Sequence, residues 1–192
     1  MKKLFLALLI SVFSISSNAQ VYVGGGLGFS SVKDAHLHNE DGDTKTTFSL
    51  VPEIGYQLDE QIAVGVTLGY SHSKYGDVKG DAFAIEPYAR YSFATLGTVD
   101  LFLEGCVGFV HIINSTKSWT GNFYHHEREN SFYVGFRPGF KVNLNQRFAL
   151  ISRVGWLGWK TTRPDDDFYT GSSEFGLNLD ATVIQFGVNY TF

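Results

Sequence analysis

Strict two-residue periodicity is the feature of this chain that most limits its fold, and it is clearest in the last segment. From Ile184 to Phe192, every even position is large and apolar, and every odd position is small or polar. Successive side chains of a β-strand point to opposite faces, so this segment is predicted to be a strand. One of its faces would be apolar and the other polar.

The same alternation recurs upstream and predicts seven further strands. These segments are 21–31, 48–57, 62–71, 83–93, 101–112, 132–143 and 148–160. The first is the weakest, because Gly24, Gly25 and Gly26 dilute its pattern. A content of 21 Gly and 16% aromatic residues, with many Thr, Val and Tyr, also favours strands over helices. The predicted fold class is therefore all-β, with eight antiparallel strands.

The connections between these segments alternate in length. Short turns are predicted around Asp59–Glu60, Leu96–Thr98 and Asn145–Gln146, and longer polar connections at 32–45, 74–80, 114–129 and 161–174. Transmembrane barrels have short periplasmic turns and longer external loops. Strands of about ten residues would also cross a bilayer at a tilt. The chain is thus predicted to be an up-and-down transmembrane β-barrel with four extracellular loops and both ends in the periplasm.

The polar face of the strands separates a membrane barrel from a soluble one. A soluble barrel such as a lipocalin would place its apolar residues inside, so alternation alone leaves both folds open. Here the polar face is rich in small residues, and a soluble surface would carry more Lys and Glu per strand. Its few charges have both signs: Glu53, Glu86, Arg90, Glu104, Arg137, Lys141 and Arg153. We predict that they pair in a lumen filled by side chains.

Aromatic residues gather toward the strand ends on the apolar face. They are Tyr70, Tyr91, Phe93, Phe132, Trp156, Tyr190 and Phe192. Amphipathic rings are favoured at membrane interfaces, where one side can stay in contact with water. We expect these residues to form two girdles on the outside of the barrel.

Residues 1–19 have the pattern of a secretory signal peptide. Two lysines precede an apolar run from Leu4 to Val12, and small polar residues follow as far as Ala19. Cleavage after Ala19 would leave residues 20–192 as the outer-membrane β-barrel domain, exported by the Sec pathway. A membrane anchor is the alternative interpretation. Beyond residue 20, no window reaches the roughly 18 uninterrupted apolar residues of a transmembrane helix.

The C-terminal strand carries a resemblance to a known family. Its apolar residues are Ile184, Phe186, Val188, Tyr190 and Phe192. Together with the signal peptide and the alternating connections, it resembles the small outer-membrane β-barrel proteins typified by OmpA and OmpX, over essentially the whole mature chain. The resemblance implies the outer membrane of a Gram-negative bacterium, and a role for this strand as the signal for the barrel-assembly machinery. Family members are linked to adhesion, envelope integrity and resistance to host defences.

The leading hypothesis is a non-enzymatic barrel that serves envelope integrity, adhesion or surface recognition. Its expected partners are outer-membrane lipid, lipopolysaccharide and an extracellular ligand of the loops. Candidate recognition residues are Trp119, Phe123, Tyr124, His125, His126, Asp165, Asp166 and Asp167. The three aspartates would suit a divalent cation, but a solvated loop is the favoured interpretation. Loss of Lys2 and Lys3 takes the net charge from −4 to −6, so no basic footprint for nucleic acid is expected.

Two other functions stay open. A small pore or transport accessory would need a wetter lumen than residues such as Phe102 suggest. A lipid A-modifying enzyme would need a His beside a nucleophile on the outward face. His72 and His111 have that parity, but Ser71 and Ser73 point to the opposite face, and no carboxylate that would orient His72 is evident. The sequence therefore predicts no enzyme, no cofactor and no metal site.

Overall fold

The computed structural model describes residues 20–33, 44–76, 78–117, 124–165, 171–178 and 184–192, and the predicted signal peptide lies outside these ranges. The strands are β1 (Gln20–Lys33), β2 (Thr44–Gln57), β3 (Ile62–Tyr75), β4 (Val78–Leu96), β5 (Val99–Lys117), β6 (Tyr124–Asn143), β7 (Phe148–Val154), β8 (Trp156–Pro164), β9 (Ser172–Asn178) and β10 (Ile184–Thr191). Among the described residues, no helix is long and apolar enough to span a membrane.

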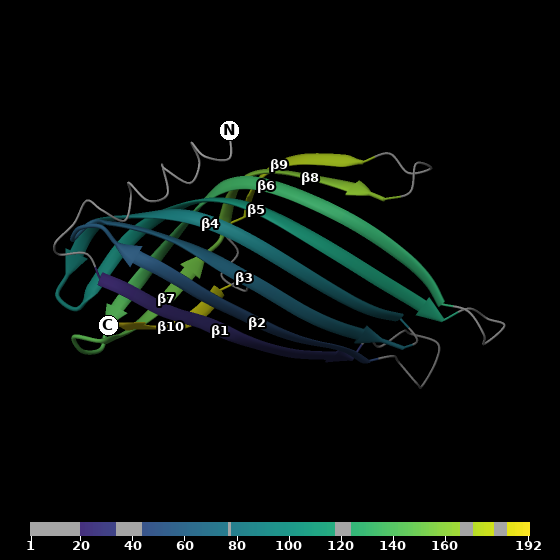
Figure 1. Cartoon of the computed structure of the whole chain (residues 1–192), viewed down its shortest axis with the longest axis horizontal. Helices are drawn as coiled ribbons and strands as arrows, with labels where there is room; N and C mark the ends of the chain where they lie inside the picture. Colours follow the sequence, from purple (N-terminus) through teal and green to yellow (C-terminus); the bar gives the residue numbers. More distant parts are fainter. Residues whose placement is uncertain (1–19, 34–43, 77, 118–123, 166–170, 179–183) are drawn as a thin grey trace, which may run out of the picture.

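These ten segments form a closed barrel of eight antiparallel strands. β7 and β8 are successive parts of one barrel strand, since both pair with β6, and β9 and β10 are successive parts of the next. From β1 to β6, each strand pairs with its neighbour in the chain. Pairing of β1 with β10, from Tyr22 opposite Thr191, closes the ring. The predicted eight-stranded antiparallel barrel is confirmed (Figure 1).

The short turns, Gln20 and the C-terminal Phe192 lie at one end of the barrel, here called the turn end; the opposite end is the loop end. Asp59 Oδ1 accepts hydrogen bonds from the backbone N–H groups of Gln61 and Ile62, at 2.8 and 2.7 Å. Between β4 and β5, Gly97 turns the chain with a φ of +65°. The C-terminal residue reaches the start of β1 at this end, because Phe192 N donates to Val21 O at 3.0 Å (Figure 1).

At the loop end the strands are longer than predicted and the connections are shorter. β5 has 19 residues and β6 has 20, against the ten or so expected. Most of 114–129 continues the β5–β6 ladder, and the predicted connection 74–80 shrinks to the two residues between β3 and β4. Residues 161–164 and 172–174 likewise belong to β8 and β9. These segments were predicted as loops because they are polar. Polar residues can still form strands where both faces of the sheet meet water, because the strand ladder satisfies their backbone hydrogen bonds.

Side chains alternate between lumen and exterior, with polar groups inside and apolar groups outside. The buried residues include Glu53, Glu86, Arg90 and Glu104. Large apolar side chains cover the outer surface, and five of them are 45–56% exposed: Phe48, Ile54, Leu68, Phe83 and Phe136. This is the reverse of a soluble barrel, and it is the arrangement that lipid requires of an exterior.

Trp156 is an exception to the predicted facing. Gly155, between β7 and β8, has a φ of +70°, and the register against β6 shifts there by one residue. Such an insertion reverses the parity of the residues that follow. Leu157 and Trp159 therefore face outward, while Trp156 lies against Gly135 in the lumen. The prediction of Trp156 as an outer girdle residue was wrong, because period two holds only along an unbroken strand.

Candidate functional site

Charged side chains from five strands meet in the middle of the lumen. They are Glu53 of β2, Glu86 and Arg90 of β4, Glu104 of β5, Arg137 of β6 and Arg153 of β7. Register explains the core of this cluster, because Arg90, Glu104 and Arg137 are directly opposite one another on adjacent strands. Residues opposite each other in this way share a face and lie within contact distance.

Glu104 is the centre of the cluster. It is fully buried, and both of its carboxylate oxygens accept hydrogen bonds. Arg90 donates to Oε2 from Nη2 at 2.8 Å and from Nε at 3.1 Å. Arg137 Nη2 and Arg153 Nε donate to Oε1, at 2.7 and 2.9 Å. One carboxylate therefore joins the guanidinium groups of three strands.

Glu53 and Glu86 complete the cluster on either side of Glu104. Arg153 Nη2 donates to Glu53 Oε2 at 2.6 Å, and Arg137 pairs with Glu86. With Glu104, the cluster holds three carboxylates and three guanidinium groups, so its formal charges cancel. Burying charges is costly unless they are paired and hydrogen-bonded, and here each one is. The buried charges of the cluster are therefore matched in number.

Neutral polar and aromatic side chains surround the cluster, and of these the sequence analysis named only Phe102. Asn189 Nδ2 donates to Glu53 Oε1 at 2.7 Å, and Tyr133 donates to Glu86. Phe102 is fully buried, with its ring centroid 4.5 Å from Arg90 Cζ. The hydroxyl groups of Tyr22 and Tyr88 lie 2.7 Å apart. All of these residues have inward parity, which is the signal that would have identified them.

Lys141 was predicted in the same network but lies apart from it. Its Nζ is 3.2 Å from Asp100 Oδ2, toward the turn end. Asn143 Nδ2 and Thr95 Oγ1 also donate to Asp100, at 2.9 and 2.8 Å. The register sets this separate pair, because Asp100 and Lys141 are opposite each other at the start of β5 and the end of β6. Asp100 was missed because it comes directly after a predicted turn.

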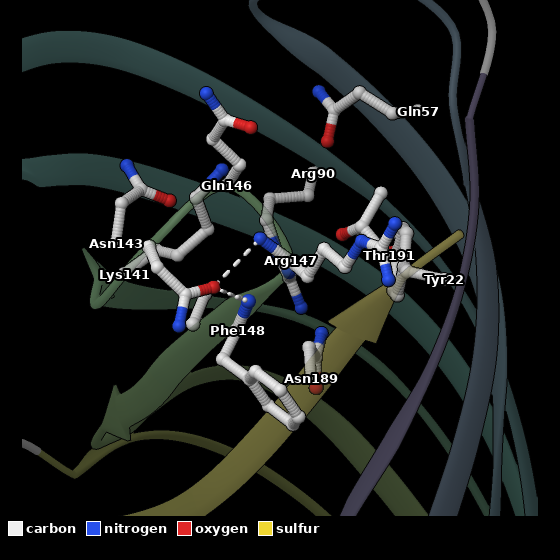
Figure 2. Close-up of a pocket in the computed structure, with 12 residues that line it drawn as sticks. Tyr22, Gln57, Arg90, Lys141, Asn143, Gln146, Arg147, Phe148, Asn189 and Thr191 are labelled. Carbon is white, nitrogen blue, oxygen red and sulfur yellow. Dashed lines mark hydrogen bonds between the residues drawn. The ribbon is translucent and has the colours of Figure 1, made fainter.

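A cavity of about 50 Å³ opens at the turn end of the lumen (Figure 2). Its lining includes Tyr22, Arg90, Lys141, Arg147 and Asn189. Asn145 Oδ1 holds the neighbouring turn by accepting from the N–H groups of Arg147 and Phe148, both at 2.8 Å. The space suits one or a few water molecules, and Asn189 Oδ1, buried without a protein partner, would accept a hydrogen bond there. Arg90 lines this cavity and also belongs to the charge cluster around Glu104.

The predicted C-terminal assembly residues face outward wherever their side chains are described. Phe186, Val188 and Phe192 are 49–70% exposed. Tyr190 stacks edge-on against Phe148 and Phe192, with both pairs of ring centroids 5.1 Å apart. Ile184 pairs with Val154 through its backbone. The strand thus presents an apolar, aromatic outer face beside its pairing with β1.

Half of the predicted loop residues fall outside the described part of the chain. Trp119, Phe123, Asp166 and Asp167 lie there entirely. The backbones of Tyr124, His125 and His126 extend β6 opposite β5, and their side chains are not described. Asp165 is exposed just after β8, where its N–H donates to Arg128 O at 2.8 Å. The structure therefore brings no predicted recognition cluster together within these ranges.

A closed antiparallel barrel with an apolar exterior and buried polar groups inside is the arrangement of an integral outer-membrane protein. The family comparison agrees: residues 5–192 match the outer membrane protein beta-barrel domain, and the chain belongs to that family. It is an outer-membrane protein that crosses the membrane with several strands. The predictions of the family and the outer-membrane location are thereby confirmed.

Among solved structures, the chain is similar to three outer-membrane proteins. Neisserial surface protein A shares 16% identity and a TM-score of 0.47, over 91% of this chain and 96% of that one. A major outer membrane protein of Thermus thermophilus shares 14% and 0.49, over 91% and 100%. The attachment invasion locus protein Ail of Yersinia pestis shares 13% and 0.46, over 91% and 97%. No curated protein matches the chain in sequence.

Proposed function

We propose that this protein is a non-enzymatic, non-conducting barrel that acts through its outer surface, in envelope integrity, adhesion or surface recognition. The observation that carries the proposal is the neutral cluster around Glu104. A scaffold of this kind needs a stable barrel whose lumen does not conduct. Matched buried charges would hold the strands together and fill the lumen. The loop end, with the candidate recognition residues near it, would face the surroundings, and the turn end would face the periplasm.

A pore is the alternative that the lumen argues against. An eight-stranded barrel is only wide enough for side chains to fill it. Here Phe102 and Glu104 are fully buried at mid-lumen, and Arg90 is 4% exposed. Of these three residues, Arg90 also lines the cavity at the turn end (Figure 2). Conduction would require the ion pairs to separate, which costs several kcal/mol for each buried charge.

A lipid-modifying enzyme is the second alternative, and the structure changes one premise of that hypothesis. The expectation that His72 has no orienting carboxylate was wrong: Asp81 Oδ1 lies 2.8 Å from its Nδ1, because the tight β3–β4 turn places the two residues opposite each other. Among the described residues that flank His72 on its own face, none is a serine, threonine or cysteine. Tyr70 and Lys74 flank His72 on its own face, and Ser73 bonds to Gly80 O instead, so the non-enzymatic proposal stands.

The partners proposed for this scaffold follow from its surfaces. The apolar exterior would contact outer-membrane lipid and lipopolysaccharide. The barrel-assembly machinery would recognise the exposed face formed by Phe186, Val188 and Phe192 after Sec-dependent export. An extracellular ligand would bind at the loop end, and nucleic acid is not a proposed partner.

The test is a deletion strain complemented with either the wild-type protein or the variant Trp119→Ala/Phe123→Ala. Survival in dodecyl sulfate measures envelope integrity, and adherence to cultured epithelial cells measures recognition. We expect deletion to lower at least one of the two, wild type to restore it, and the loop variant to fail only in adherence. If deletion changes neither readout, the proposed function is wrong.

A further inference from the structure

A band of positive charge lies on the outside of the barrel at the loop end. Its members are Lys74 of β3, Lys79 of β4, Arg128 of β6 and Arg163 of β8, and all four are exposed. Each lies an even number of residues from an exposed apolar side chain of its own strand, so each faces outward. Lys74 and Lys79 are also directly opposite each other in the β3–β4 ladder. We call these four residues the outer cation band.

The cations of the band outnumber the carboxylates beside them on this surface. Asp165, just after β8, is exposed two residues from Arg163, and its N–H donates to Arg128 O at 2.8 Å. Asp81 lies two residues from Lys79 on the outward face of β4, and it already has two polar neighbours. Tyr70 OH donates to its Oδ1 at 3.0 Å, and His72 Nδ1 lies 2.8 Å from the same atom. Glu129 and Glu174 have inward parity at this end. Within the described ranges, none of the four cations is part of an ion pair.

The band borders the apolar exterior directly. Along β4, Lys79 and Asp81 are followed on the same face by Phe83 and Ile85, which are 53% and 48% exposed. Along β6, Arg128 precedes Phe132 by four residues. Four residues of strand span about 13 Å, so each cation lies within a lipid headgroup's reach of the apolar wall. A molecule that matches this surface must carry both negative charge and acyl chains.

We propose that the outer cation band binds the phosphate groups of lipid A, while the apolar wall below it contacts the acyl chains. The inference deepens the proposed function and rests on its orientation, with the loop end outside. Arginine pairs with phosphate through two parallel N–H groups, and lysine acts as a point charge. Continuity with the apolar wall selects a lipid over a soluble anion, since a soluble anion gains nothing from that wall.

The test is native mass spectrometry of the refolded mature protein, released from detergent micelles that contain lipid A. The variant Lys74→Gln/Lys79→Gln removes two cations of the band. The control Lys45→Gln/Arg147→Gln removes two cations elsewhere, one with lumenal parity and one at the turn end. One cation near a lipid surface changes affinity about fivefold, so the band variant should bind roughly twenty-five-fold more weakly, and the control should bind like wild type.

Two further lipids identify what is bound. Lipid A without phosphates should bind to the wild-type protein weakly, with about the affinity that intact lipid A has for the band variant. Phosphatidylglycerol at equal concentration should fail to displace lipid A. The proposal is overturned if the band variant retains lipid A like wild type, or if dephosphorylated lipid A or phosphatidylglycerol binds equally well. Folding of each variant is checked by its faster migration on an unboiled gel. The measurement in micelles does not depend on orientation or conductance, so it can fail independently of the proposed function.

Discussion

Replacing Glu104 by glutamine removes the negative charge at the centre of the lumen without changing the size of the side chain. The cluster would then hold two carboxylates and three guanidinium groups, all buried. Removing one partner of a buried ion pair costs about 3–5 kcal/mol, because the remaining charge stays uncompensated. At an m value of roughly 2 kcal/mol per molar urea, the unfolding midpoint should fall by about 2 M.

The assay is unfolding and refolding in lipid vesicles across a urea series, with the folded fraction read from migration of unboiled samples on a gel. Glu60→Gln, in an exposed turn, is the matched control and should change stability by less than about 0.5 kcal/mol. Combining Glu104→Gln with Arg153→Met restores equal numbers of acids and bases, and should recover part of the loss. An unchanged midpoint for Glu104→Gln would refute the assignment of these charges to a closed, paired lumen.

Three other variants examine separate parts of the structure. Gly139→Ala would drive a methyl group into the ring of Phe102, so its stability should fall by about 1–3 kcal/mol in the same urea assay, whereas Gly105→Ala has ordinary contacts and should not. Asp100→Asn should cost only about 1 kcal/mol, because its pair with Lys141 is partly exposed; a loss as large as that of Glu104→Gln would contradict their separation. Phe192→Ala should lower the amount of barrel in the outer membrane several-fold on immunoblots, with refolding in vitro unchanged, while equal amounts would remove its role in assembly.

Much of the barrel could be predicted because facing follows directly from period two. Arg90, Glu104 and Arg137 have inward parity in the sequence, and their strands β4, β5 and β6 are consecutive in the chain, so their meeting in the lumen required no long-range information. The apolar exterior and the short turns were predictable for the same reason. The predicted lumenal set held three acids and four bases, and the acid that it lacked is Asp100, the partner of Lys141.

Features that depend on register or on a local break were not predictable from the pattern. The insertion at Gly155 reverses the direction in which Trp156 faces. In a glycine-rich chain, the sequence pattern does not distinguish Gly155 from the other glycines. The pairing of His72 with Asp81 depends on the length of one turn, because a shift of one residue would place the two on opposite faces. Tyr22 and Tyr88 were overlooked because tyrosine side chains occur on barrel exteriors as well as inside them.

The most direct test of the closed lumen is single-channel recording of the refolded wild-type protein in planar bilayers. The neutral cluster around Glu104, with Phe102 and Arg90 beside it, predicts a flat baseline with no regular conductance steps at moderate voltage. Glu104→Gln, which leaves the lumen with uncompensated positive charge, should be the variant in which transient openings first appear. Steady, uniform steps from the wild-type protein would mean that the lumen conducts, and would contradict the account.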